Sequence, residues 1–236
     1  MTRKRDARAN RLLAALPAAD RARLSPHLEP EQVELKQLLY EPGKHIDCVY
    51  FPRTAVVSVL TTMDDGSGVE IATIGNEGMV GVPLFLGTTF MPVREFSQAQ
   101  VPGEVIRMDA DTFQEETAAG GALHHIVQRY VQAFFSQVSQ QVACNGLHSI
   151  EERCSRWLLL THDRVGSDEF PLTQEFLSQM LGVRRASVTV AAGMLQSAGF
   201  IRYRRGRMTV IDREGLEGSS CECYGIIRGE FDRLLG

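Results

Sequence analysis

The stretch from residue 170 to 212 constrains this chain more than any other, because it joins two short amphipathic segments through a glycine. Thr173 stands where a helix N-cap is expected, and the apolar residues after it recur with the spacing of one buried helix face. Gly182 then interrupts the pattern where a sharp turn needs the left-handed backbone conformation that glycine adopts without steric cost. The spacing predicts a helix, a tight turn and a second helix from about Arg184 to just before Gly199.

A basic hairpin is expected directly after the second helix, where strand-forming runs flank the tetrapeptide Arg204-Arg205-Gly206-Arg207. Between Pro171 and Arg207 there are six arginines and one acid, Glu175, which gives a local charge of +5 in a chain whose net charge is -4. Counterion release favours the binding of such a local positive charge to DNA, whatever the net charge of the whole chain. The order of elements predicts a winged helix-turn-helix that binds DNA. The alternative is a small helical subdomain with a solvated basic face.

Nine residues of this region are candidates for contact with DNA. The second helix should offer its N-terminal end to the major groove, while the hairpin and the start of the first helix lie on the phosphates. The candidates for base readout are Arg185, Ser187 and Thr189. The candidates for backbone contact are Thr173, Gln174, Arg184, Arg204, Arg205 and Arg207.

The composition, with 44% hydrophobic and 23% charged residues, is ordinary for a soluble globular protein. No apolar run approaches the roughly 20 residues that span a bilayer. Residues 1–20 begin with basic residues, and the mildly apolar stretch after them is interrupted by Pro17 and Asp20. A secretory signal does not have this pattern. Five cysteines, mostly far apart, do not have the pattern of a disulfide framework. We therefore expect a cytoplasmic protein with no membrane segment.

Upstream of this region the sequence predicts a β domain followed by a long helix, so the fold class is α+β. One or two short helices are expected within residues 10–28. Residues 32–108 then hold short strand-like runs separated by turn signals, which is typical of a β-barrel or jelly roll, with the clearest hairpin at Asp65-Gly66. After Asp109 an apolar seam spaced by threes and fours predicts a helix that forms a dimer stalk, the alternative being packing within one chain. The seam consists of Leu123, Val127, Tyr130, Phe134, Val138 and Val142.

In this order of parts the chain resembles the Crp/Fnr family of bacterial transcription regulators over nearly its whole length. The resemblance rests on the turns at 41–43 (EPG) and 75–81 (GNEGMVG), and on the helix-turn-helix from Thr173 through Gly182 to Val188. It implies a homodimer that binds a near-palindromic operator in double-stranded DNA and acts with RNA polymerase. It also implies three parts: a cyclic-nucleotide-binding-like β-roll sensor domain (1–110), a dimerisation helix (111–148) and a winged helix-turn-helix DNA-binding domain (149–236). We expect the tail from residue 214 to form a short helix that packs back on the last of these.

The recognition helix departs from the family pattern of arginine-glutamate followed by a later arginine. Arg185 matches the first position, but Ala186 replaces the acid and Val190 replaces the second arginine. One bidentate contact to guanine remains, worth about 1–3 kcal/mol of discrimination. The resemblance therefore implies a different or looser operator, with a larger share of the affinity carried by phosphates.

The effector site departs further from the family's cyclic-nucleotide cassette, in which a glutamate binds the ribose and an arginine binds the cyclic phosphate. Gly81 is followed by Val82 and Pro83, with no carboxylate, and Arg94 is followed by Glu95. Gly81 and Arg94 remain the candidate effector-binding residues, although Arg94 suits an ion pair better. Cyclic AMP in the usual mode is not expected, and the effector is unknown.

The cysteines leave one alternative function open. The iron-sulfur branch of the family carries cysteines near the N terminus, whereas here none precedes Cys48, so no such cluster is expected. Cys221-x-Cys223 is half of a possible metal site, but only Cys154 and His162 lie near it in sequence, so we expect packing or exposed thiols and no metal. The alternative is a redox-responsive regulator that uses Cys221 and Cys223.

No catalytic pattern appears in the sequence, and the chain is not expected to be an enzyme. The β region holds a single histidine, His45, which excludes the His-rich metal triad of a cupin enzyme. Neither a nucleophile-base pair nor a phosphate loop of catalytic type occurs. A last alternative is a ligand- or protein-binding module whose helix-turn-helix no longer binds DNA.

Overall fold

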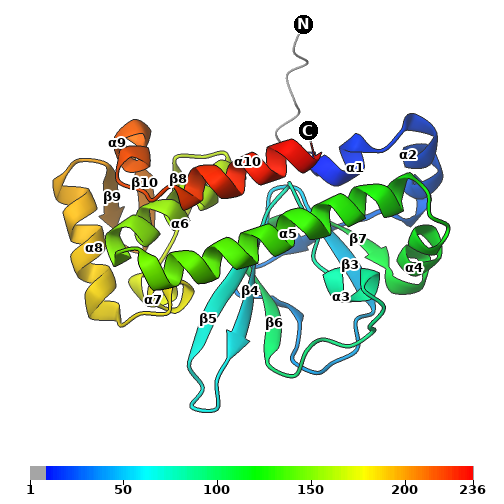
Figure 1. Cartoon of the computed structure of the whole chain (residues 1–236), viewed down its shortest axis with the longest axis horizontal. Coiled ribbons are helices and arrows are strands. Elements are labelled where there is room, and N and C mark those ends of the chain that lie inside the picture. Colours follow the sequence, from blue (N-terminus) through cyan, green and yellow to red (C-terminus); the bar gives the residue numbers. More distant parts are fainter. Residues whose placement is uncertain (1–8, 236) are drawn as a thin grey trace, which may run out of the picture.

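The computed structural model describes residues 9–235. Residues 1–8, the first part of the segment that was expected not to be a secretory signal, lie outside the described residues. A long helix spans the molecule, with a β-roll on one side of it and a smaller helical domain beyond one end of the roll (Figure 1). Within residues 9–235 no helix combines the length and the apolar character that crossing a membrane requires. The expected N-terminal helices are present as α1 (Arg11–Ala15), α2 (Ala18–Leu24) and a short 3-10 helix (Ser25–His27).

Two antiparallel sheets form the β-roll and confirm the expected β domain. One sheet has the order β1-β7-β3, from Glu29–Val33, Gly103–Asp109 and Cys48–Pro52. The other has the order β2-β6-β4-β5, from Leu38–Tyr40, Glu95–Val101, Val56–Thr62 and Gly68–Ile74. Asp65-Gly66 lies in the loop of the β4–β5 hairpin, as predicted. Strand β6 was not predicted, because its buried residues include the small side chains Ser97 and Ala99, which give little hydrophobic signal.

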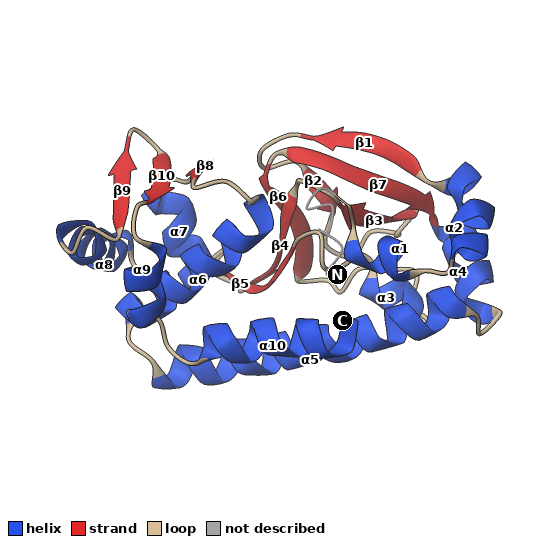
Figure 2. Cartoon of the chain, turned by 90° about the horizontal axis from the view of Figure 1, so that it is seen from above, coloured by secondary structure: helices blue, strands red, loops and turns tan. Residues whose placement is uncertain are grey.

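The expected helix over 111–148 is two helices, α4 (Ala110–Ala118) and α5 (Ala122–Leu147). The break lies at Gly120, whose positive φ of 69° interrupts the helical hydrogen bonds. A further short helix, α3 (Val82–Phe85), follows β5 and lies near α4 (Figure 2). The dimerisation segment of the sequence prediction therefore reduces to α5, which has 26 residues.

The apolar seam predicted on this helix divides between two faces of α5. Leu123, Val127 and Tyr130 are buried within the chain, and the Tyr130 hydroxyl donates to the Met79 carbonyl at 2.9 Å. The prediction that the whole seam serves a dimer is therefore wrong for its N-terminal half, where packing within the chain prevails. A second apolar row, spaced by four, three and four, lies on the more exposed side of α5: Val131, Phe135, Val138 and Val142.

The C-terminal domain begins with α6 (Ile150–Val165), which starts in a capping box between Ser149 and Glu152. It continues through β8, α7, α8, β9 and β10 to α9 and α10. Their bounds are Glu169–Pro171, Gln174–Leu181, Arg185–Ser197, Ile201–Arg204, Arg207–Val210, Arg213–Gly218 and Cys223–Leu235. Strand β8, which the sequence did not reveal, pairs with β10 and makes the wing a three-stranded sheet.

The tail was expected to pack back on the DNA-binding domain. Its last helix, α10, instead returns along the long helix α5 (Figure 2). Gln140 of α5 donates to the sulfur of Cys223, and the rings of Tyr130 and Phe231 lie 6.4 Å apart. Because residue numbers fall along α5 as they rise along α10, the two helices are antiparallel. The apolar side of α10 is buried against α5, which explains why this position is favoured.

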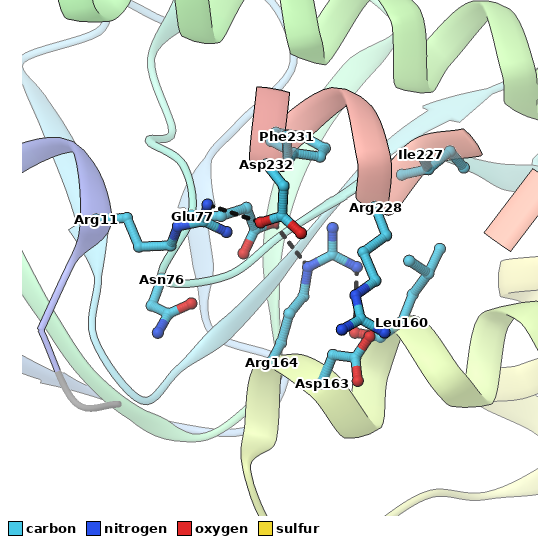
Figure 3. A pocket seen from close by; sticks show the side chains of 10 residues that line it. All are labelled: Arg11, Asn76, Glu77, Leu160, Asp163, Arg164, Ile227, Arg228, Phe231 and Asp232. Carbon is cyan, nitrogen blue, oxygen red and sulfur yellow. Dashed lines mark hydrogen bonds and ion pairs between the residues drawn. The ribbon is translucent and has the colours of Figure 1, made fainter. Parts of the chain in front are cut away.

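Buried polar contacts fasten the C-terminal domain to the β-roll. Arg164 of α6 pairs with Glu77, in the turn after β5, at 2.8 Å, and both side chains are buried. The indole nitrogen of Trp157 donates to the Glu70 carboxylate at 2.9 Å. Figure 3 shows the Arg164–Glu77 pair in a cavity of about 390 Å³ whose walls come from α1, α6, α10 and this turn. The domains are therefore joined by specific polar pairs as well as by apolar packing.

Candidate nucleic-acid interface

The helix-turn-helix has the predicted bounds and caps. The Thr173 hydroxyl accepts from the backbone N–H of Phe176 and so caps α7. Gly182 ends α7 in the left-handed conformation, with φ of 62°, and α8 begins three residues later at Arg185. A Cβ at Gly182 would lie 2.8 Å from a methyl carbon of Val69 in β5, so the turn also packs against the β-roll.

Gly182→Ala should therefore destabilise the protein by about 1–3 kcal/mol, the cost of a non-glycine residue held in the left-handed region. Gly193→Ala is the matched control, because a Cβ there meets no atom within 4 Å and Gly193 lies inside α8. The control should stabilise by about 0.5–1 kcal/mol, since alanine favours helix. Urea denaturation measures both changes, and equal effects of the two substitutions would contradict this account of the turn.

Helix α8 buries one face and leaves the other open to solvent. Val188, Ala191, Ala192 and Leu195 form the buried face. Arg184, Arg185 and Thr189 are exposed at its N-terminal end, whereas Ser187 is half-buried. Two apolar residues also lie on the open face, Val190 at 60% and Met194 at 47% exposure. The exposed side of α8 thus combines positive charge with methyl-bearing side chains.

The starts of the two helices are tied together by a hydrogen bond in which the Thr189 hydroxyl donates to the Gln174 side-chain oxygen at 3.0 Å. The amide nitrogen of Gln174 keeps its donors available for a ligand. Arg184, the N-cap residue of α8, makes no side-chain cap, so the first N–H groups of α8 are not capped by its side chain. A helix N-terminus in this condition favours an anion such as a DNA phosphate.

The wing brings its arginines to a two-residue hairpin turn. Arg205 and Gly206 both have positive φ, 52° and 75°, which suits a type I′ turn between paired Arg204 and Arg207. Arg204 and Arg205 are exposed, while Arg207 forms an ion pair with Glu169 at 2.5 Å. The negative charge of Glu169 reduces the contribution expected from Arg207.

Arg202 was not among the predicted DNA contacts, although it is exposed two residues before Arg204 on β9. Alternate residues of a strand lie on one face, so Arg202 and Arg204 project together. The period-2 pattern of residues 201–204 was the signal that could have identified it. The backbone N–H of Tyr203 donates to the Gln196 side chain at 2.8 Å, which fixes the wing against α8.

The two predicted effector residues are not brought together. Gly81 lines a cavity of about 310 Å³ in the β-roll, which Phe134 of α5 also lines. Arg94 lies outside it, where its exposed side chain pairs with Asp64 at 2.7 Å. Among the described residues no arginine or lysine lines the cavity, and burial raises the pKa of its one carboxylate, Glu95. The cavity walls are therefore mainly apolar and offer no cation to a phosphate.

Comparison with known families agrees with both halves of this architecture. Residues 30–119 match the cyclic nucleotide-binding domain family, and residues 152–218 match the Crp-like helix-turn-helix domain family. The chain is a Crp/Fnr-type transcription regulator. Its helix-turn-helix lies inside the second match, and all the residues that line its β-roll cavity except Phe134 lie inside the first.

Solved structures share the fold of this regulator at low sequence identity. A crp/fnr family regulator from Eubacterium rectale has 17% identity and a TM-score of 0.67, over 88% of this chain and 96% of that one. FixK2 from Bradyrhizobium japonicum has 15% identity and a TM-score of 0.68, over 82% and 98%. A CRP family regulator from Thermus thermophilus has 20% identity and a TM-score of 0.67, over 82% and 99%. No curated protein matches the chain at a significant level.

Proposed function

We propose that two copies of this chain bind a near-palindromic operator in double-stranded DNA, with α8 of each copy in the major groove. The observation that supports this most strongly is the open N-terminal end of α8, where Arg184 and Arg185 are exposed. Helix α8 lies at the end of the molecule away from the centre of the β-roll (Figure 1). The exposed wing arginines lie in the same domain and can reach flanking phosphates. The protein acts without catalysis, in the cytoplasm, and works with RNA polymerase.

Base readout rests on one arginine and on apolar contacts. Arg185 can bind O6 and N7 of a guanine, while Ser187 and Thr189 adjoin it on the same helix. Val190 and Met194, which are exposed five and nine residues after Arg185, suit the methyl groups of thymine. We infer an operator half-site in which a guanine is followed by A·T pairs.

The dimer forms along the exposed row of α5. Phe135 and Val142 are 67% and 70% exposed, although both are large and apolar. With Val131 and Val138 they repeat every three or four residues, which is the spacing of a two-helix coiled-coil seam. Two-fold symmetry about this seam would present the two α8 helices to successive major grooves.

The effector of the β-roll is an uncharged or apolar small molecule in this proposal. The apolar walls of the cavity support an uncharged effector. So does the observation that no arginine or lysine is among the described residues that line the cavity. Because Phe134 of α5 lines the cavity, an occupant would touch the same helix that carries the dimer row.

Variants of two arginines test the DNA-binding proposal. Arg185→Ala should cost about 1–3 kcal/mol on the operator and little on random DNA, because it removes base readout. Arg205→Asn removes a phosphate contact yet keeps the positive φ that asparagine tolerates, so it should weaken all sequences alike and reduce the salt slope by about 1. Fluorescence anisotropy over a salt series, on an operator selected from random DNA, measures both.

Arg21→Ala serves as the charge control, because Arg21 lies on α2, which belongs to a different part of the chain. It should leave both affinities unchanged. Equal losses on operator and random DNA for Arg185→Ala and Arg205→Asn would refute the assignment of roles.

A further inference from the structure

Four metal-binding side chains meet where the end of α5 faces the start of α10. Cys144 lies in the last turn of α5 and His148 is its C-cap residue, while Cys223 is the first residue of α10 and Cys221 lies two residues before it. One ligand atom from each lies within 4.8 Å of every other. The three cysteines are buried and His148 is partly so. We propose that these residues form a tetrahedral zinc site that fastens α10 to the dimerisation helix.

The sequence had suggested other neighbours for the Cys221-x-Cys223 pair. His162, which lies nearer in sequence, instead pairs with Asp168 at 2.8 Å and contacts Arg213. Cys154 is buried and does not belong to the group of four. No metal was expected because only Cys154 and His162 lie near this pair in sequence. The antiparallel return of α10 along α5 instead places Cys144 and His148 beside the pair.

The spacing of the donor atoms fits a single ion. The sulfurs of Cys144 and Cys221 are 3.5 Å apart, and the sulfur of Cys223 lies 3.5 Å from Nδ1 of His148. Tetrahedral zinc, with Zn–S of about 2.3 Å and Zn–N of about 2.0–2.1 Å, places two sulfurs about 3.8 Å apart and a sulfur and nitrogen about 3.6 Å apart. These two pairs need to open by only a few tenths of an ångström, and the other donor atoms lie within 4.8 Å of one another, so small side-chain movements would admit the ion.

The imidazole of His148 is oriented for a ligand. Its Nδ1 faces the sulfurs, while Nε2 lies 3.3 Å from a carboxylate oxygen of Glu222. A carboxylate that accepts from Nε2–H holds the tautomer whose Nδ1 lone pair is free, and metal-bound histidines commonly have such a partner. Gln140 donates a hydrogen bond to the sulfur of Cys223 at 3.0 Å.

A buried positive charge beside the group calls for a negative partner. Arg156 is only 2% exposed, and its Nε and one terminal nitrogen have no hydrogen-bond partner. Nε of Arg153 is likewise buried without one. Both arginines lie close enough to Cys144 for their charges to interact. Three thiolates and a neutral histidine on Zn²⁺ carry a net charge of -1, which would compensate a buried guanidinium, whereas neutral thiols or a disulfide would not.

The chemistry and the place in the fold indicate a structural site. Thiolate and imidazole ligands suit zinc, and four protein ligands leave no open position for substrate. The ion would join residue 148 to residue 221 and so close the whole winged helix-turn-helix region into one loop. Links that close long loops stabilise a fold by restricting the unfolded chain. The site would thereby hold the DNA-binding domain in a fixed relation to α5.

Metal content of the full-length protein tests the site. Protein purified under reducing conditions and dialysed against metal-free buffer should contain about one zinc per chain by inductively coupled plasma mass spectrometry. Cys144→Ser and Cys223→Ser should each lose most of it, whereas Cys48→Ser, which replaces a buried cysteine outside the group, should retain it. Co²⁺ added to zinc-free protein should give the visible bands of a tetrahedral thiolate site, which zinc then bleaches.

Two milder variants keep the test informative if the serine variants fail to fold. His148→Cys supplies a fourth thiolate and should keep the zinc, while Glu222→Gln should weaken zinc binding about 10-fold. The proposal is overturned by iron in place of zinc, or by less than about a tenth of an equivalent after incubation with zinc. A titre of three free thiols among the five cysteines, the sign of a Cys144–Cys221 disulfide, would also overturn it.

Discussion

Phe135→Glu is expected to convert the dimer into monomers and to lower operator affinity by about 100-fold or more. The side chain of Phe135 is 67% exposed in the single chain, so a glutamate there costs the monomer little. In the dimer the same glutamate would lie opposite its copy across an apolar seam. There the two carboxylates would be removed from water and would repel each other, which destabilises the dimer. A bivalent protein that becomes monovalent loses the roughly 10²–10⁴-fold gain of a second linked half-site.

Arg129→Glu is the matched control, because Arg129 is exposed on another side of α5, six residues before Phe135. It introduces an acid on the same helix without entering the row. Sedimentation velocity measures the association state, and anisotropy on operator DNA measures affinity. A Phe135→Glu protein that stays dimeric, with the affinity of the control, would show that the row is not the interface.

The second large effect is expected from Arg164→Met, which should destabilise the protein by about 3–5 kcal/mol. This substitution leaves the Glu77 carboxylate buried between the two domains without its partner. Arg164 also donates to the Gln137 side-chain oxygen of α5 at 3.5 Å, so its loss removes a second contact between elements. The single tryptophan, Trp157, lies in the same helix and packs at the interface, so its fluorescence reports on this contact during urea unfolding.

Two controls separate burial from charge. The double variant Arg164→Met/Glu77→Gln removes both charges and should recover most of the loss, because no unpaired ion remains. Arg94→Ala breaks the exposed pair with Asp64 and should change the free energy of unfolding by no more than about 1 kcal/mol. If Arg164→Met and Arg94→Ala have equal effects, the Arg164–Glu77 pair does not fasten the domains.

The helix-turn-helix could be predicted almost residue by residue because its signals are local. The cap at Thr173, the left-handed turn at Gly182 and the tight turn at Arg205-Gly206 each depend on a few neighbouring residues. Their side chains and backbone preferences act over one turn of chain, so no distant partner has to be known. The same holds for the Asp65-Gly66 hairpin.

Features that depend on distant partners were not predictable from the sequence. The seam of α5 divides because Tyr130 packs against Met79 in the β-roll, a contact between residues 51 positions apart. The cysteine group forms because α10 returns along α5, which places Cys221 beside Cys144 across 77 positions. Periodicity shows that a face is apolar, but it does not show which element covers that face.

The effector site could be predicted only in part from the sequence. The departure from the cyclic-nucleotide pattern could be read from Gly81, Val82 and Pro83 directly, and the structure adds that the cavity is largely apolar. The side chain of Arg94 turns to Asp64 on the surface, and only coordinates could show this direction. A sequence motif identifies candidate ligands, whereas their convergence depends on the packing of several loops.

The most direct test of the central claim is the stoichiometry of the complex with a fluorescently labelled duplex that carries the protein's own promoter region. Sedimentation equilibrium at low ionic strength should give two chains per duplex, with a single cooperative step as protein is added. One chain per duplex at saturation, or no complex at all under these conditions, would contradict the proposal that a dimer reads two half-sites.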